Sequence, residues 1–272
     1  MKNFISSIAP DLLFKDGIWF AKETSAISYP SEGNDACFEL EDTSFWFKHR
    51  NNCIKTVIEK FASTKTLFDI GGGNGYTAKA LENADIQTVL VEPGISGVLN
   101  AQKRGVKNLV CATLKNAKFR PDSIPNLGLF DVLEHIEDDS EFLHELHSVL
   151  QADGKLFITV PAFRFLWSED DKLAGHFRRY TMSSLKKTAL KAGFDVVYAS
   201  YFFSVLTLPV FLLRTIPGFF NIKKVTETKK EHKAGKLQVV FDNIWKKEVK
   251  RIKNGKKIPI GSSLLMVLNK RT

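Results

Sequence analysis

The sequence contains few cysteines and no segment typical of export. Its three cysteines, Cys37, Cys53 and Cys111, are too few and too widely separated for a disulfide framework or a zinc site, because both need paired spacings. The N-terminal residues lack the continuous apolar region of a signal peptide, since Pro10 and Asp11 interrupt it. We therefore expect a cytoplasmic protein with reduced thiols.

The composition is that of one globular domain with an elaboration. With 272 residues, 44% hydrophobic and 25% charged, the chain is not typical of wholesale disorder, collagen or coiled coil. The net charge of +9 is concentrated, because residues 221–257 contain thirteen Lys or Arg against four acidic residues. The remainder is a neutral body, so the total charge alone does not indicate nucleic acid as a partner.

Apolar patterns of helices and strands alternate along the chain from residue 46 onward. Helical spacing occurs at 46–61, 76–83, 96–104, 139–150 and 183–192. Short strands are expected at 66–70, 88–91, 108–111, 127–130, 155–160 and 195–199, with a last strand at 262–268. This alternation predicts an α/β fold with a doubly wound, mostly parallel, seven-stranded sheet of the Rossmann-like kind. A ligand is then expected beyond the carboxyl ends of the strands.

The most informative segment is a glycine-rich turn between an apolar strand and a helix. The strand at 66–70 carries Asp69 near its end and leads into the run Gly71-Gly72-Gly73-Asn74-Gly75. Glycines there let the backbone pass close beneath a ligand. Glu92 ends the next strand, where a carboxylate can accept hydrogen bonds from both ribose hydroxyls of a nucleoside. Together these residues predict an adenosine cofactor.

Two features favour S-adenosylmethionine over NAD as that cofactor. A dinucleotide fingerprint that begins at Gly71 requires glycine or alanine at position 76, whereas this chain has Tyr76. Asp69 is unhelpful to a diphosphate but suits the cationic amino acid end of S-adenosylmethionine. A tight turn that binds nothing is the alternative.

Three stretches resemble class I S-adenosylmethionine-dependent methyltransferases: 68–75, 91–92 and 128–138. The last is similar to the branch that contains ubiquinone-biosynthesis methyltransferases and enzymes of bacterial polysaccharide and natural-product clusters. The resemblance continues at 167–180 and 192–194, and residues 261–270 look like the last strand of the family. It implies S-adenosylmethionine as cofactor, S-adenosylhomocysteine as product, and a cofactor site of Asp69, Gly71, Gly73, Asn74, Gly75, Glu92, Phe130 and Asp131.

The sequence departs from this family after the third strand. The family often has an acidic residue there, near the adenine, whereas this chain has Cys111-Ala112-Thr113. We therefore expect no adenine contact of that kind. On the same pattern we divide the chain into an N-terminal extension expected to form a helical lid (1–45), a methyltransferase core (46–202), an apolar and basic insert (203–260) and the last strand of the core (261–272).

Two histidines are candidate general bases. Methyl transfer to an alcohol or phenol requires alignment of the nucleophile and removal of its proton. His135 follows the fourth core strand beside Asp131 and Glu134, and His176 lies in the loop after the fifth. For each the alternative is a purely structural loop residue. The nearby acids form no recognisable metal-ligand grouping in the sequence, so we expect no metal.

Substrate recognition is expected from two places. The loop that contains His176 is dense in charged and aromatic residues, which suits a polar or anionic substrate, and its candidates are Arg178, Arg179 and Tyr180. Trp46 belongs to an aromatic stretch at 44–50 that could cover the cofactor and exclude water. Ordinary helix packing is an equally open alternative for Trp46.

The insert combines an apolar segment with a basic amphipathic helix. The uncharged run at 196–213 is at the lower limit for a membrane span, contains Pro209 and begins in an expected core strand, so we do not expect a span. Residues 237–253 have an apolar stripe with lysines and arginines mostly off it. This helix either packs on its own domain or contacts an anionic membrane surface. Nucleic acid is less favoured, because no RNA-binding motif accompanies the charge.

These observations predict an S-adenosylmethionine-dependent methyltransferase. The expected acceptor is a hydroxyl on a sugar, a lipid-linked molecule or another polar small molecule. Residues 203–257 are expected to permit peripheral contact with the inner membrane surface. The alternatives are an RNA methyltransferase that uses the basic insert and a non-catalytic nucleoside-binding protein.

Overall fold

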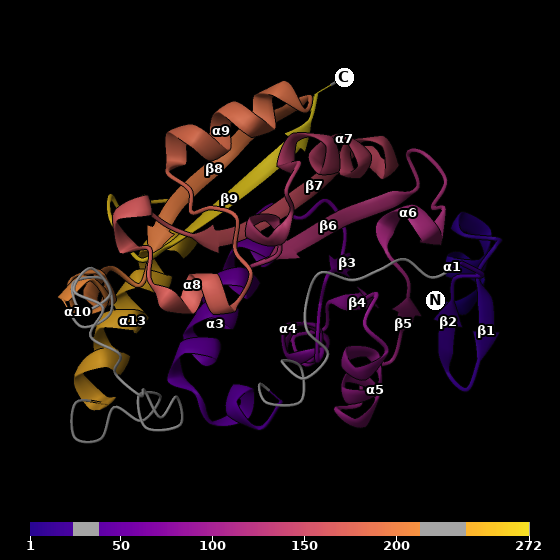
Figure 1. Ribbon diagram of the computed structural model, residues 1–272, viewed down its shortest axis with the longest axis horizontal. Helices are drawn as coiled ribbons and strands as arrows, with labels where there is room; N and C mark the ends of the chain where they lie inside the picture. The colour runs from indigo at the N-terminus through magenta and orange to yellow at the C-terminus, as the bar shows by residue number, and fades with distance from the viewer. Residues whose placement is uncertain (24–37, 213–237, 272) are drawn as a thin grey trace.

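A single mixed sheet with helices on both faces organises the computed structural model, which describes residues 1–23, 38–212 and 238–271 (Figure 1). In these residues the strand order is β1-β2-β5-β4-β3-β6-β7-β9-β8. The bounds are β1 (Leu13–Lys15), β2 (Ile18–Phe20), β3 (Thr66–Ile70), β4 (Gln87–Val91), β5 (Leu109–Cys111), β6 (Ile124–Phe130), β7 (Leu150–Pro161), β8 (Phe194–Phe202) and β9 (Ser263–Lys270).

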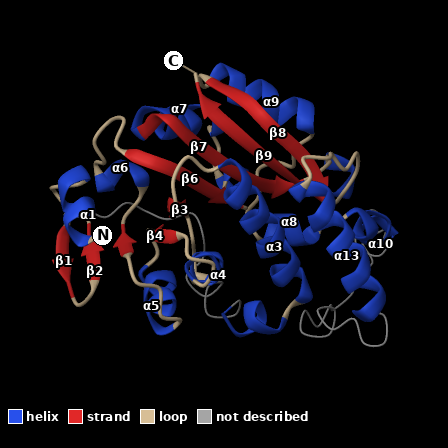
Figure 2. Ribbon diagram, turned by 180° about the vertical axis from the view of Figure 1, so that it is seen from behind, coloured by secondary structure: helices blue, strands red, loops and turns tan. Residues whose placement is uncertain are grey.

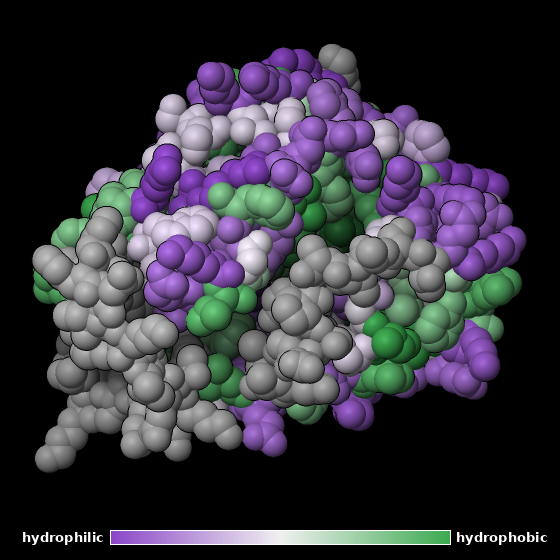
Figure 3. Space-filling model, viewed as in Figure 1, coloured by the Kyte–Doolittle hydropathy of each residue, from purple (hydrophilic) through white to green (hydrophobic). Residues whose placement is uncertain are grey.

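Apolar helix faces cover the sheet from two sides (Figures 1 and 2). One side carries α1 (Lys2–Ile8), α6 (Leu114–Ala117), α7 (Asp139–Val149) and α9 (Met182–Lys191). The other carries α3 (Phe45–Phe61), α4 (Tyr76–Glu82), α5 (Ile95–Lys103) and α13 (Gln238–Lys253). The outer surfaces of α7 and α9 are hydrophilic (Figure 3), as expected of helices that bury one stripe. The short helices are η1 (Leu133–His135), η2 (Arg164–Leu166), α8 (Glu169–Leu173), η3 (Ser204–Leu206) and α10 (Thr207–Val210).

The sheet is doubly wound, and its direction of winding reverses between β3 and β6. Both strands adjacent to β3 run parallel to it, with Asp69 opposite Leu90 of β4 and Gly128 of β6. The chain moves outward through β4 and β5, returns to β6 on the other side of β3, and continues to β7. Strand β9 is antiparallel to both β7 and β8. The reversal leaves a crevice at the carboxyl ends of β3, β4 and β6, where ligands bind in such sheets.

The described sheet has nine strands, so the expectation of seven is wrong in number. The two extra strands, β1 and β2, form an antiparallel hairpin, and β2 pairs in parallel with β5 at the edge. Asp16 and Gly17 turn the hairpin with φ of 51° and 87°, a combination that this dipeptide adopts readily. The hairpin strands have only three residues each, too few for a periodic pattern. Residues 13–20 of the expected lid therefore extend the sheet instead.

Strand β7 begins earlier than its apolar pattern predicts. Residues 152–154, an Ala-Asp-Gly run of the kind that often forms a turn, are part of the strand. The pairing of β7 with β6 shifts register between Ile124 and Asn126. Gly154 allows this irregularity, because a Cβ there would lie 2.7 Å from the carbonyl oxygen of Pro125. A close backbone approach, rather than a turn, explains the glycine.

The predicted amphipathic helix of the insert forms as α13 and packs on its own domain. Its neighbour is α3, and the side chains of Trp245, Glu248 and Ile252 are buried while Lys246 and Lys247 are exposed. Part of the insert, residues 213–237, lies outside the described residues. Across 1–23, 38–212 and 238–271, no helix is both long and apolar enough to cross a membrane.

A buried carboxylate, Glu248, fastens α13 to the rest of the domain. Its Oε2 lies 2.9 Å from His49 Nε2 of α3 and accepts a hydrogen bond from Phe203 N at 3.0 Å. Its Oε1 accepts from Ser204 N at 2.8 Å and from the Ser204 hydroxyl. Burial alone would raise the pKa of this carboxyl, but the bonds from His49 and Ser204 outweigh it and lower the pKa. The carboxylate thus joins α3, the end of β8 and α13.

We predict that Glu248→Ala lowers the free energy of unfolding by about 3 kcal/mol, because the two backbone N–H groups and His49 lose their common partner inside the protein. Urea denaturation monitored by circular dichroism measures this. The control is Lys247→Ala on the exposed side of α13, for which we expect a change within about 0.5 kcal/mol. Equal stabilities of the two variants would contradict the role given to Glu248.

Candidate functional site

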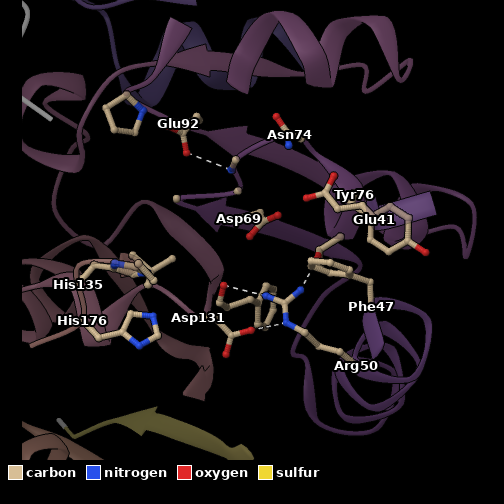
Figure 4. A pocket seen from close by; sticks show the side chains of 18 of the residues that line it. Glu41, Phe47, Arg50, Asp69, Asn74, Tyr76, Glu92, Asp131, His135 and His176 are labelled. Atoms are coloured by element: carbon tan, nitrogen blue, oxygen red, sulfur yellow. Dashed lines mark hydrogen bonds and ion pairs between the residues drawn. The ribbon is translucent and has the colours of Figure 1, made fainter. Parts of the chain in front are cut away.

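A cavity of about 440 Å³ opens at the carboxyl ends of β3, β4 and β6. Asp69, Glu92 and Asp131 each stand at the end of one of these strands, or just after it, and border the cavity (Figure 4). Helix α3 and the helical residues 38–43 close one side, and η1 and the loop after α8 close another. The cavity is therefore at the crevice that the topology predicts.

The glycine loop, residues 71–75, turns beneath the cavity in a backbone conformation that residues with a Cβ atom rarely adopt. Gly71, Gly73 and Gly75 have φ of 70°, 50° and 74°. A Cβ at Gly72 would lie 2.8 Å from Asp69 Oδ2, and one at Gly75 would lie 2.7 Å from Ala101 Cβ. Gly71 and Gly73 border the cavity, whereas Gly75 precedes α4 and shapes the turn; cofactor binding by all three stays a prediction.

Asp69 presents a carboxylate that nothing in the described protein satisfies fully. The residue is 1% exposed, and Oδ2 has no hydrogen-bond partner among the described residues. Burial raises the pKa of this carboxyl to about 7, with Arg50 opposing the shift and Glu92 adding to it. A buried anionic group at the edge of a cavity is suited to a cationic ligand group.

Glu92 is fixed by the loop that it faces. Its Oε2 accepts a hydrogen bond from Gly73 N at 3.0 Å (Figure 4), and its Oε1 accepts from Gly94 N at 2.7 Å. Burial raises the pKa of the carboxyl despite these two bonds. Each oxygen has a second lone pair, so the carboxylate can still accept from vicinal hydroxyls in the cavity. This is the role predicted from the sequence.

Asn74 and Glu41 form another polar wall of the cavity. The Asn74 side chain accepts from Asn100 Nδ2 at 3.1 Å and also bonds to Glu41. Glu41 lies 2.9 Å from Arg104, yet burial outweighs that cation and raises the pKa of Glu41 to about 7. Sequence reasoning missed Glu41, because it belongs to a short helix whose partners are distant in the chain.

Arg50 is the most consequential residue that sequence reasoning missed. From α3 it donates through Nε to Asp131 Oδ2, through Nη1 to Thr77 Oγ1 at 3.0 Å and through Nη2 to Phe130 O at 2.8 Å. Asp131 and Phe130, which the sequence predicts as cofactor contacts, border the cavity, but one oxygen of Asp131 is engaged by this arginine. The available signal was the position of Arg50 one turn before Cys53 and Ile54, on the apolar face of the helix.

Trp46 borders the cavity together with Phe47. Its ring stacks on Phe203 with centroids 5.3 Å apart and planes 9° apart. Trp46 thus does both things that the sequence left as alternatives: it packs within its own domain and it forms part of the cavity wall.

The two predicted histidines come together at the opposite end of the cavity from Asn74 and Glu41 (Figure 4). The ring centroids of His135 and His176 are 4.7 Å apart in an edge-to-face arrangement. Burial, and then the neighbouring His176, lower the pKa of His135 to about 4. The Nδ1 atom of His176 lies 2.8 Å from Asp171 Oδ1.

Three of the expected substrate contacts do not reach this cavity. Tyr180 is 2% exposed, and its hydroxyl donates to Asp139 Oδ2 at 2.7 Å. Arg178 also pairs with Asp139, at 3.0 Å, and Arg179 forms a fork with Asp171 at 2.8 and 2.9 Å. In the described structure their polar groups fix the loop itself, and substrate binding by these three residues stays a prediction.

The structure brings together three side chains that the sequence did not group as metal ligands, while the absence of a metal stays a prediction. Glu134, His135 and His176 each offer one donor atom, and these atoms lie within 4.8 Å of one another. The sequence could not show this grouping, because about forty residues separate His176 from the other two.

Residues 46–199 match the model of a family described as methyltransferase domain, and the match covers more than half of the chain. The chain belongs to this methyltransferase family. A relative from Mycobacterium tuberculosis, named a probable S-adenosylmethionine-dependent methyltransferase, is 23% identical over 168 residues, which are 60% of this chain and 61% of the relative. The aligned part therefore spans less than two thirds of that relative.

Solved structures share the fold of this methyltransferase domain at low sequence identity. The phosphoethanolamine N-methyltransferase 2 of Haemonchus contortus, in complex with S-adenosyl-L-methionine, has a TM-score of 0.56 and 17% identity over 89% of this chain and 58% of its own. A SAM-dependent methyltransferase from Thermotoga maritima has a TM-score of 0.54 and 16% identity over 88% and 97%. The [4+2]-cyclase SpnF has a TM-score of 0.51 and 16% identity over 81% of both chains. The reaction must therefore be argued from the site.

We predict that Asp69→Asn gains stability relative to the wild type as the pH rises. The folded pKa of about 7 exceeds the ordinary 3.8, so the folded protein retains a proton that the unfolded chain releases. The contribution of Asp69 to the free energy of unfolding is therefore greatest below pH 3.8. It falls by a few kcal/mol, roughly, as the pH rises to about 7. The advantage of the asparagine variant should therefore grow between pH 4.5 and 7 and then level off.

Urea denaturation of the ligand-free protein at pH 4.5, 6 and 7.5 measures this difference. Asp153→Asn, at an exposed position, is the control and should show no such trend. A difference between Asp69→Asn and wild type that does not change with pH would refute the assignment of the buried proton to Asp69.

Proposed function

We propose that the protein is an S-adenosylmethionine-dependent methyltransferase that methylates a hydroxyl on a sugar, a lipid-linked molecule or another polar small molecule. The observation that carries the proposal is the buried, unsatisfied Asp69 carboxylate beside the glycine loop, in a chain of the methyltransferase family. Family membership supports the reaction type, and the polar end of the cavity supports the acceptor class.

The described residues fit the cofactor along one wall of the cavity. Asp69 would hold the ammonium group, Glu92 would accept from the ribose hydroxyls, and the backbone of Gly71 to Gly73 would lie against the ligand without side-chain obstruction. When bound, S-adenosylmethionine supplies an electrophilic methyl group on a sulfonium, which a nucleophile takes by in-line displacement.

The protein's own part is to close the site and orient the acceptor. Trp46 and Phe47 provide an aromatic wall on α3, which excludes water and presents ring faces to a cation. Arg50 fixes α3 against the ends of β6 and α4 and compensates the charge of Asp131. The ion pair between Arg50 and Asp131, together with apolar contacts, thus holds the aromatic wall of α3 in place.

The acceptor would lie at the histidine end of the cavity. His135 and His176 are adjacent, border the cavity, and come from the loops that follow β6 and α8. An alcohol must lose its proton as it takes the methyl group, so a pair of imidazoles at this position supports a hydroxyl acceptor. Membrane contact through 203–257 remains a prediction, since 213–237 lie outside the described residues.

We predict that Glu92→Gln weakens S-adenosylhomocysteine binding by about 10- to 100-fold, because one acceptor for the ribose hydroxyls loses its charge and the other is replaced by an NH2 donor. Isothermal titration calorimetry on the full chain measures the affinity, with Asp153→Asn as a control expected to match wild type. Wild-type protein that prefers NADH to S-adenosylhomocysteine would overturn the cofactor assignment.

Acceptor class is tested by incubating the protein with methyl-labelled S-adenosylmethionine and separate panels of hydroxylated small molecules, glycolipids and RNA. We expect label in a hydroxylated small molecule or glycolipid, with equimolar S-adenosylhomocysteine, and about 100-fold lower kcat/KM in Asp69→Ala. Label in RNA alone would favour the RNA alternative. Binding without turnover on any panel would favour a nucleoside-binding protein.

A further inference from the structure

A third polar side chain, Glu134, adjoins the two histidines at the acceptor end of the cavity. Glu134 and His135 are consecutive in η1, and His176 comes from the loop after α8 (Figure 4 shows the histidines side by side). One carboxylate oxygen and one nitrogen from each ring all lie within 4.8 Å of one another. Two separate loops thus bring three donor groups to one point.

Glu134 is a buried acid that forms no ion pair with a described residue, although Arg50 and Arg179 partly oppose the rise in its pKa that burial causes. It is 1% exposed, and its Oε2 has no hydrogen-bond partner among the described residues. Asp131 and Asp171 are each paired with an arginine, whereas Glu134 forms no ion pair in the described chain. A carboxylate removed from water is costly unless a cation or hydrogen bonds compensate it. A cation bound beside Glu134 would compensate it.

His176 is oriented in the way that metal-ligating histidines are. Its Nδ1 lies 2.8 Å from Asp171 Oδ1, and Asp171 is itself fixed by the Arg179 fork and by Ser168 N at 2.8 Å. A carboxylate on one ring nitrogen holds the proton there and leaves Nε2 with a lone pair for a metal. The contacts of Asp171 with His176, Arg179 and Ser168 N therefore fix the orientation of the His176 ring.

We propose that Glu134, His135 and His176 bind one divalent transition-metal cation. Two imidazoles and one carboxylate favour Zn²⁺, Mn²⁺, Fe²⁺ or Co²⁺ over Ca²⁺ and Mg²⁺, which prefer all-oxygen sites. Metal–donor distances of about 2.0–2.2 Å place two donors at most about 4.4 Å apart, so small side-chain rotations close the observed spacing. Three protein ligands leave positions open toward the cavity.

The metal would bind the acceptor oxygen and make it a nucleophile, an inference that rests on the proposed function. Coordination lowers the pKa of a hydroxyl, so its proton passes to solvent at neutral pH. The oxygen then forms its bond to the methyl carbon as the carbon–sulfur bond breaks and its electron pair stays on sulfur. In this arrangement the histidines act as ligands and neither one has to remove the proton.

Titration of the tag-free, chelator-treated full chain with Co²⁺ alone tests the site, by calorimetry and by visible absorption of the bound ion. We expect one equivalent bound to wild type, with a rise in melting temperature. Glu134→Gln and His176→Ala should each weaken binding more than 100-fold. Asp171→Asn, which replaces the supporting carboxylate and also weakens its fork with Arg179, should weaken it by about 10- to 100-fold. His144→Ala, at an exposed position on α7, should bind like wild type.

The proposal is overturned if wild type binds no Co²⁺, or if His176→Ala binds it as tightly as wild type. S-adenosylhomocysteine binding checks that each variant is folded, and His176→Asn or His135→Gln replaces a variant that is not. Full turnover in the presence of chelator would overturn the metal but leave the proposed function intact. Stoichiometric Co²⁺ binding without any S-adenosylhomocysteine binding would defeat the proposed function and leave the metal site standing.

Discussion

The fold withdraws several carboxylates from water around one cavity, and the site depends on how each of these groups is compensated. Glu92 is compensated by two backbone N–H groups, and Asp131 by Arg50. Asp69 and Glu134 each keep an oxygen without a hydrogen-bond partner among the described residues. Charges that the fold compensates shape the cavity, whereas charges that it leaves uncompensated favour binding of cationic groups. The ammonium of the cofactor and a metal ion are such groups.

Helix α3, which forms one side of the cavity, is held in place by contacts with distant parts of the chain. Arg50 links α3 to β6 and α4 near the cavity, and His49, the preceding residue, meets Glu248 of α13. The basic helix therefore bears on the site through packing, since it supports the helix that carries Trp46. This explains why an acidic residue is buried in the most basic part of the sequence.

The parts of the site that could be predicted are local in sequence. A strand, its terminal acid and a glycine turn are consecutive residues, so Asp69, Gly71 and Gly73 follow from one pattern, and Glu92 follows from the next strand. Parallel winding then places His135 at the same edge of the sheet. The hairpin at Asp16 and Gly17 was missed because its strands are too short for a pattern.

Residues whose role depends on a distant partner could not be predicted. Arg50 and Asp131 are 81 positions apart. Arg178 and Tyr180 have the composition of a substrate loop, yet both bond to Asp139 at the start of α7. The grouping of Glu134 with His176 likewise depends on how two loops meet. Such pairings are set by the tertiary fold, which no single segment specifies.

Proton release on cofactor binding tests most directly whether Asp69 is the buried group that meets the ammonium of the cofactor. Calorimetric titration of S-adenosylhomocysteine at pH 6.5, in buffers of different ionisation enthalpy, counts the protons exchanged. Because the Asp69 pKa is about 7 in the free protein, an arriving ammonium group should expel its proton. We expect net proton release by wild type and much less by Asp69→Asn; no release, or equal release by both, would show that Asp69 does not bind the ammonium group.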